Sequence, residues 1–224
     1  MKKLACLFLL CAIAYPQVAE RANEEYKTKD GRARVARNQI NAAREERQRP
    51  RDIVDQMGLQ PGQSVADVGT GPGFMLPYLS HAVGDRGTVY AEDIQQDFLD
   101  QAKTRANTLS LQNVKFILGT DKDPNLPANT LSGVLVLDVY HHFDYPEMML
   151  SHIRDSLVSD GRLVVVEYYK RRGAMPNGDA GRAIEHIRLD EDDLIKEVEA
   201  NGFKVADKHE LVPKSQYIVT FVKK

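Results

Sequence analysis

The stretch Ser64–Phe74 constrains the fold of this chain more than any other. It reads S-V-A-D-V-G-T-G-P-G-F, so a short apolar run is followed by glycines at three alternate positions. The apolar run is typical of a buried parallel strand. The glycines predict a sharp turn with bare backbone amides, because glycine tolerates positive φ and has no side chain. A helix that begins after this turn would direct its free N–H groups at the same space, so the stretch predicts a strand, a nucleotide-type binding loop and a helix.

The spacing of the glycines separates this loop from two common alternatives. A dinucleotide fingerprint requires a small residue where Phe74 stands, which disfavours a nicotinamide-dependent oxidoreductase. A phosphate-binding P-loop requires Gly-Lys-Ser/Thr, and the stretch contains no lysine. Asp67 would repel a pyrophosphate and attract a cationic amine. The loop therefore favours a cofactor that has a positive charge and no phosphate.

The pattern D-x-G-x-G-x-G, which begins at Asp67, resembles the first motif of class I S-adenosylmethionine-dependent methyltransferases. Two more acids, Asp93 and Asp121, follow the second and third expected strands. In that family the first such acid holds the ribose and the second accepts from the adenine amino group. The resemblance covers roughly residue 52 to the C-terminus and implies S-adenosyl-L-methionine as the cofactor. The residues predicted to bind the cofactor are Asp67, Gly69, Thr70, Gly71, Gly73, Asp93, Ile94, Thr120, Asp121 and Asp138.

Strand and helix patterns alternate along the rest of the chain. We expect further strands over 88–91, 114–118, 133–137, 162–168, 203–212 and 216–222, and helices over 51–57, 95–109, 146–157 and 191–201. Such alternation predicts an α/β fold with right-handed crossovers and a doubly wound, mostly parallel sheet. With the first strand the sheet has seven strands, and the resemblance implies a Rossmann-like methyltransferase fold with an antiparallel C-terminal strand pair. The ligand crevice of such a sheet lies outside the carboxyl ends of the strands.

The end of the fourth strand is the best candidate for chemistry. Tyr140, His141 and His142 follow it and are predicted to position or deprotonate an acceptor; in the family this place lies beside the transferring methyl group. An alternative for His142 is a histidine at a helix entry that is bonded to the backbone. Adjacent histidines are also metal-ligand types, but consecutive strand residues point to opposite faces. Because no third ligand has a recognisable spacing, the sequence predicts no metal site.

A basic, glycine-containing segment follows the fifth strand, over residues 168–188. It contains Lys170, Arg171, Arg172, Arg182 and Arg188 against two acids. A mobile basic loop over the crevice favours an anionic or phenolate-like acceptor, and a solvated flexible loop is the alternative. The segment lacks interleaved stacking aromatics, and the net charge of the chain is −2, so nucleic acid is not an expected partner.

The N-terminal residues 1–19 have the form of a secretory signal peptide. Two lysines precede the apolar run 4–13, and Ala12-Ile13-Ala14 is a small-x-small cleavage pattern. The run is too short for a transmembrane helix of about 20 residues. Both cysteines lie inside this segment, and lipidation of Cys11 is a less favoured alternative. The segment predicts a periplasmic or secreted protein. A cytosolic cofactor supply conflicts with export, so a cytoplasmic location stays open.

Residues 20–50 are rich in charge and are expected to form a helical arm, with a polar helix over 34–47. This arm is either solvated or a lid over the cofactor crevice, and we expect residues 51–224 to form the methyltransferase domain that the resemblance implies. We predict transfer of a methyl group to a small-molecule acceptor by in-line displacement. The alternative is an exported, non-catalytic ligand-binding protein on the same scaffold. The sequence does not indicate the acceptor or the oligomeric state.

Overall fold

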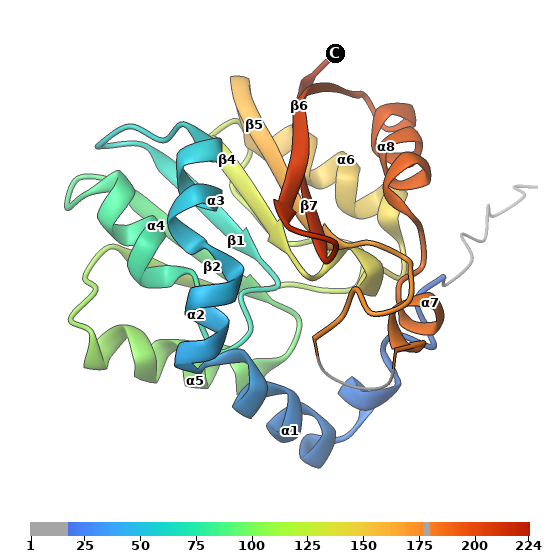
Figure 1. Ribbon diagram of the computed structural model, residues 1–224. Helices are drawn as coiled ribbons and strands as arrows, with labels where there is room; N and C mark the ends of the chain where they lie inside the picture. Colours follow the sequence, from blue (N-terminus) through green and yellow to red (C-terminus); the bar gives the residue numbers. More distant parts are fainter. Residues whose placement is uncertain (1–17, 177–179) are drawn as a thin grey trace, which may run out of the picture.

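A seven-stranded sheet organises the computed structural model, which describes residues 18–176 and 180–224 (Figure 1). The strands are β1 (Ser64–Val68), β2 (Thr88–Asp93), β3 (Val114–Leu118), β4 (Leu131–Leu137), β5 (Leu157–Tyr168), β6 (Phe203–Val212) and β7 (Gln216–Lys223). Their order in the sheet is β3-β2-β1-β4-β5-β7-β6. Strands β1 to β5 pair in parallel, and β7 runs antiparallel to both β5 and β6. The predicted fold class is confirmed.

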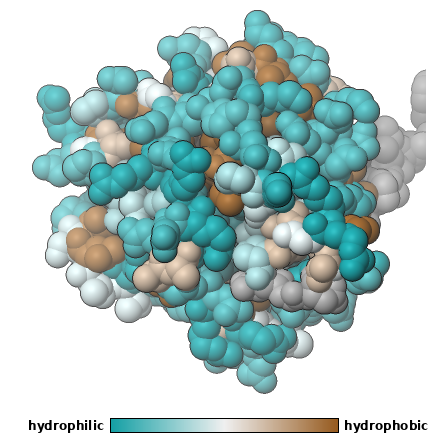
Figure 2. Space-filling model, in the orientation of Figure 1, coloured by the Kyte–Doolittle hydropathy of each residue, from teal (hydrophilic) through white to brown (hydrophobic). Residues whose placement is uncertain are grey.

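Helices cover both faces of the sheet because its central strands are apolar on both sides. In β4, Val134 packs into the cluster under α6 and α8, while Leu135 packs into the cluster under α3, α4 and α5. The main helices are α3 (Pro50–Met57), α4 (Leu76–Val83), α5 (Gln96–Thr108), α6 (Pro146–Ser156) and α8 (Glu191–Ala200). The remaining ones are α1 (Lys29–Gln39), α2 (Ala42–Gln48), α7 (Arg182–His186) and the 3₁₀ turns η1 (Glu24–Lys27) and η2 (Tyr140–His142). Figure 2 shows a mainly hydrophilic outer face on which apolar residues form small, separate groups.

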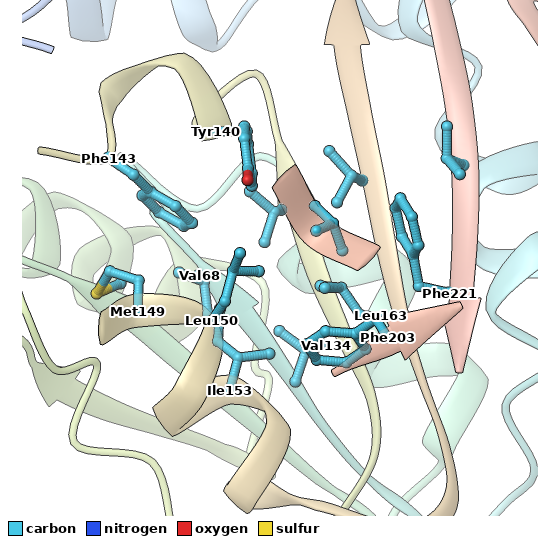
Figure 3. Close-up of a cluster of buried hydrophobic side chains, with 14 of the residues drawn as sticks. Val68, Val134, Tyr140, Phe143, Met149, Leu150, Ile153, Leu163, Phe203 and Phe221 are labelled. Atoms are coloured by element: carbon cyan, nitrogen blue, oxygen red, sulfur yellow. The ribbon is translucent and has the colours of Figure 1, made fainter. Parts of the chain in front are cut away.

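The turn after β4 is anchored in the core by two aromatic rings. The rings of Tyr140 and Phe143 lie 5.4 Å apart between centroids, and both are buried. Figure 3 shows them at one end of the apolar cluster that α6 helps to form. The Tyr140 hydroxyl donates to Glu197 of α8 over 2.7 Å. Tyr140 therefore fixes the position of the turn that carries the two adjacent histidines.

The N-terminal arm, residues 20–50, differs from the single polar helix expected over 34–47. It consists of η1, α1 and α2, and the helix is interrupted at Ile40 and Asn41. The interruption has a local cause, because the Asn41 side chain accepts from the Arg44 backbone N–H and begins a new helix. Pro50 then stands at the start of α3, as expected. In Figure 1 the arm runs along the side of the sheet where the parallel strands end.

The described part of the segment after β5 contains a short helix and a small buried cluster. Ala174, Ala183 and Ile187 are buried with Tyr168 in a small cluster, and α7 lies within this segment. The predicted signal segment falls almost entirely outside the described residues, which begin at Val18. Within residues 18–176 and 180–224, no helix has both the length and the apolar character that a membrane crossing requires.

Candidate active site

A cavity of about 260 Å³ lies beyond the carboxyl ends of β1, β2 and β4. In the sheet, β1 has β2 on one side and β4 on the other, so the strand order reverses at β1. Ligands of doubly wound sheets bind at such a point, outside the carboxyl ends of the strands. Asn23, Tyr26 and Lys27 of the arm line the cavity from the opposite side. The sequence-predicted residues among its lining are Gly69, Asp93, Ile94, Thr120, Asp121 and His142.

The glycine loop after β1 holds two carboxyl groups of β2 in place. The N–H of Gly69 donates to Glu92 over 3.2 Å, and the N–H of Gly71 donates to Asp93 over 2.9 Å. Asp93 also accepts from the N–H of Gln95 over 2.8 Å. Both loop glycines have positive φ, 70° and 55°, as a turn of this kind requires. The amides expected to be bare are therefore engaged, and they orient the carboxylate predicted to hold a ribose.

Burial raises the pKa of Asp93 to about 6, although the hydrogen bonds from the backbone act in the opposite direction. Glu92, to which no sequence motif points, is buried as well, and its Oε1 has no hydrogen-bond partner among the described residues. Burial also raises the pKa of Glu92 well above its ordinary value. A Cβ at Gly119 would lie 1.9 Å from this Oε1, so the glycine leaves room for the carboxyl. An unpartnered buried oxygen at a cavity wall is suited to bind a polar ligand.

Three of the predicted cofactor residues support the loop and do not line the cavity. Asp67 is buried and accepts from the Thr70 hydroxyl over 2.7 Å. Burial raises the pKa of Asp67 to about 7. A Cβ at Gly73 would lie 2.8 Å from the Leu76 side chain, so this glycine allows α4 to pack closely. Asp67 thus stabilises the loop from below and does not face the cavity.

Asp138 lies on a second cavity, of about 190 Å³, between the arm and the turn after β4. Its carboxylate is 3.2 Å from the guanidinium of Arg44 and accepts from Gln216. Arg44 also lies over the ring of Phe74, 4.4 Å from its centroid. Phe74 stands where a dinucleotide fingerprint would have a small residue, and its ring helps to hold the arm through Arg44. Arg44 and Gln216 could not be found by motif spacing.

The arm also fills space at the glycine loop. A Cβ at Gly71 would lie 2.4 Å from the Oε1 of Gln39, at the end of α1. The loop is therefore covered by a side chain of the arm in this structure, where the sequence predicted an open bend. The rim residues Thr120 and Asp121 are exposed, and the Thr120 hydroxyl accepts from the N–H of Asp123 within its own turn.

The two adjacent histidines are joined by a third. The ring centroids of His141 and His142 lie 4.0 Å apart, and His186 of α7 lies 4.9 and 5.3 Å from them. The expectation that the pair points to opposite faces was wrong, because the residues lie in the turn η2 and not in a strand. Burial lowers the pKa of His142 well below its ordinary value and that of His186 to about 3, so both imidazoles are neutral at neutral pH.

The sheet order β3-β2-β1-β4-β5-β7-β6 with an antiparallel β7 is that of the Rossmann-like methyltransferase fold. Residues 66–165 match the family model described as "Methyltransferase domain". A SAM-dependent methyltransferase from Aquifex aeolicus has a crystal structure that is 27% identical, with a TM-score of 0.77 over 85% of this chain and 98% of that one.

Two curated relatives match with similar identity. Aklanonic acid methyltransferase DauC of Streptomyces sp. strain C5 is 27% identical over 56% of this chain and 57% of its own length. The ubiquinone/menaquinone biosynthesis C-methyltransferase UbiE of Citrobacter koseri is 26% identical over 54% of this chain and 48% of its own length. The chain spans about half the length of these two relatives. Residues 66–165 are thus a methyltransferase domain of the class I S-adenosylmethionine-dependent family, and S-adenosyl-L-methionine is the cofactor that this family implies.

Proposed function

We propose that this chain transfers a methyl group from S-adenosylmethionine to a small-molecule acceptor by in-line displacement. The observation that carries the proposal is the pair of β2 carboxyl groups that the glycine loop holds at one cavity wall. These groups suit a ligand with hydroxyl donors and a positive charge, and no basic side chain of the loop favours a phosphate. The unpartnered Oε1 of Glu92 is an independent sign that the cavity accepts a polar ligand. The residues therefore fit the cofactor.

In this proposal each part of the cavity has a separate task. Asp93 binds the ribose hydroxyls, Thr120 and Asp121 lie at the adenine end, and Gly69 allows close approach of the backbone. The cofactor supplies an activated methyl group when bound. The chain contributes chiefly by orienting the two reactants, which is worth about 7–11 kcal/mol. A general base would add about 10²–10⁴-fold, or about 3–5 kcal/mol, so positioning is the larger effect.

We further propose that the arm is a lid. The volume of about 260 Å³ lies below the range of about 300–1,000 Å³ that is common for small-molecule sites. Gln39 at Gly71 and Tyr26 at the cavity wall are the side chains that would have to move for the cofactor to enter. The ion pair between Arg44 and Asp138 would hold the lid closed afterwards.

The acceptor is proposed to be an anionic or phenolic small molecule. Arg44, Arg47 and Arg182 line the second cavity, beside the histidines. The relatives named above are said to act in quinone biosynthesis and on aklanonic acid, which supports an aromatic acceptor with acidic oxygen groups. The close packing of Gln39 on the glycine loop favours one rival function, a protein that binds a ligand in the second cavity without methyl transfer.

Labelled S-adenosylmethionine and a panel of phenols, quinols, amines and carboxylates test the proposal. We expect label to appear in at least one phenolic or quinolic product, and Asp93→Ala should abolish the transfer. His81 is exposed and lines neither cavity. The control variant His81→Ala should therefore keep methyl transfer. The absence of S-adenosylmethionine binding in calorimetry would refute the proposal and favour the rival, which needs no cofactor.

Export is a separate proposal. The backbone N–H groups of Val18 and Ala19, the first two described residues, both donate to Asp144, each over 3.2 Å. Cleavage after Ala14 would leave these contacts intact. A fusion of residues 1–25 to a reporter that is active only after export should be active, and a purely cytosolic reporter signal would refute export.

A further inference from the structure

We propose that His141, His142 and His186 bind a divalent transition metal ion, with zinc as the preferred one. Their candidate ligand nitrogens all lie within 4.8 Å of one another. Three histidines with an open fourth position are a common ligand set of catalytic zinc sites. The sequence does not indicate this set, because His186 belongs to a separate helix, α7, while His141 and His142 lie in η2. The fold brings them together at the mouth of the crevice.

The first support for the site is the hydrogen bond that orients His141. Its Nδ1 lies 2.6 Å from Oε2 of Glu167, a residue that is 1% exposed. The same carboxylate accepts from the backbone N–H groups of His141 and Tyr168, over 3.2 and 2.7 Å. A carboxylate can only accept, so Nδ1 carries the hydrogen and Nε2 keeps its lone pair. Metal-binding histidines are typically oriented by a carboxylate in this way.

The second support is the amide that orients His142. The Nδ2 of Asn23 donates to the His142 carbonyl over 3.0 Å and to Asp144 over 3.1 Å. Its Oδ1 must then face Nδ1 of His142, which lies 2.8 Å away. An amide oxygen accepts, so Nδ1 of His142 also carries the hydrogen and Nε2 is again free. Two of the three rings are therefore held in the tautomer that a metal ion requires, each by a different partner.

The geometry needs only a small contraction to receive an ion. Tetrahedral zinc with Zn–N bonds of about 2.0–2.1 Å separates its ligand nitrogens by about 3.3–3.4 Å. The candidate ligand nitrogens of the three histidines lie within 4.8 Å of one another. Rotation of the side chains can close the difference from the spacing around zinc. His186 is half-buried on a short helix, so its ring is the natural one to move. His141 and His142 are held by their hydrogen bonds and would move less.

The open coordination position would face the second cavity, which all three histidines line together with Arg44, Arg47 and Arg182. His142 also lines the cofactor cavity, so the ion would lie between the two. A phenol or similar acceptor bound there would be held as its anion by the metal ion, with its proton released to solvent. This role in acceptor binding rests on the proposed methyltransferase function, whereas the metal site itself does not.

The test uses the full chain, purified without a polyhistidine tag and treated with a chelator. We expect Co²⁺ to bind with one equivalent and to give the visible absorption bands of a tetrahedral site, and zinc to displace it. His186→Ala should weaken Co²⁺ binding at least 100-fold. Glu167→Gln should weaken it about 10–100-fold, as is typical of groups that orient a metal ligand. The control variant His81→Ala should bind like the wild type.

Two results would overturn the site: a wild-type protein that gives no cobalt bands, or His186→Ala binding Co²⁺ as tightly as the wild type. If Glu167→Gln fails to fold, Asn23→Ala replaces it, because Asn23 is only partly buried and orients His142. Circular dichroism of each metal-free variant shows whether the fold is kept. Calorimetry with S-adenosylmethionine is run separately, so failure of the metal site and failure of the proposed function give different results.

Discussion

The carboxylate of Asp93 should make cofactor binding depend on pH. Burial is the main cause that raises its pKa from 3.8 to about 6 in the folded chain without ligand. A ribose hydroxyl and a cationic ligand are bound better by the ionised form, so a proton competes with the cofactor. With a pKa of about 6, the carboxyl is almost fully ionised at pH 8 and about nine-tenths protonated at pH 5. The apparent dissociation constant should therefore rise about elevenfold between these two pH values.

The measurement is calorimetry with S-adenosylmethionine at pH 5, 6, 7 and 8, on the wild type and on Asp93→Asn. The variant keeps the shape of the side chain and an oxygen that can accept from Gly71, so the loop should remain in place. Asp93→Asn should bind S-adenosylmethionine more weakly than the wild type at pH 8. Its dissociation constant should lack the elevenfold rise between pH 8 and pH 5. Other titrating groups, including the cofactor's own amine, affect both proteins and cancel in the ratio of the two profiles. A ratio that does not change with pH would refute the role given to Asp93.

Three further perturbations test the loop, its support and the arm. Gly71→Val should abolish cofactor binding in calorimetry, because φ is 55° and the new side chain would meet Gln39; normal affinity would contradict the site. Asp67→Asn should stabilise the cofactor-free protein in urea unfolding more at pH 8 than at pH 4. The reason is that the folded pKa of about 7 exceeds the unfolded value of 3.8, so the stability from this carboxyl is fully present below 3.8 and is lost as the pH rises through 7; equal effects at both pH values would refute this. Arg44→Met should destabilise by about 1–3 kcal/mol, because the pair is partly buried and Asp138 keeps its hydrogen bond from Gln216, and should speed proteolysis of the arm; an unchanged cleavage rate would show that the ion pair does not hold it.

The fold was predictable because its signals are local. The apolar run Ser64–Val68, the glycines after it and the alternation of later segments indicate a parallel sheet without any knowledge of distant contacts. That Asp93 and Asp121 line one cavity could be expected, because the strand ends in such a sheet share one edge. The break at Asn41 was missed because a capping side chain outweighed the helix propensity of its neighbours.

The site was predictable only where its residues belong to a motif. Glu92 stands next to Asp93, and the lack of a hydrogen-bond partner for its Oε1 becomes visible only when Gly119 and β1 are in place. His186, Glu167 and Asn23 are brought to the histidine pair by three different segments. Their sequence spacing has no meaning outside this fold. The assumption of a strand at His141 and His142 also hid the cluster, because a 3₁₀ turn does not alternate its side chains between two faces.

The arm connects the two parts of the site, which leads to a last prediction. Asn23 lines the cofactor cavity and orients His142, and the ring of Tyr26 lies 4.7 Å from that of His142. An open arm would therefore remove both a wall of the cofactor cavity and the partner that sets the His142 tautomer. If the arm is the lid, zinc and S-adenosylmethionine favour the same closed state, and each should raise the affinity for the other by the same factor. Calorimetry of the cofactor with and without one equivalent of zinc measures this factor, and equal affinities would show that the arm does not couple the two sites.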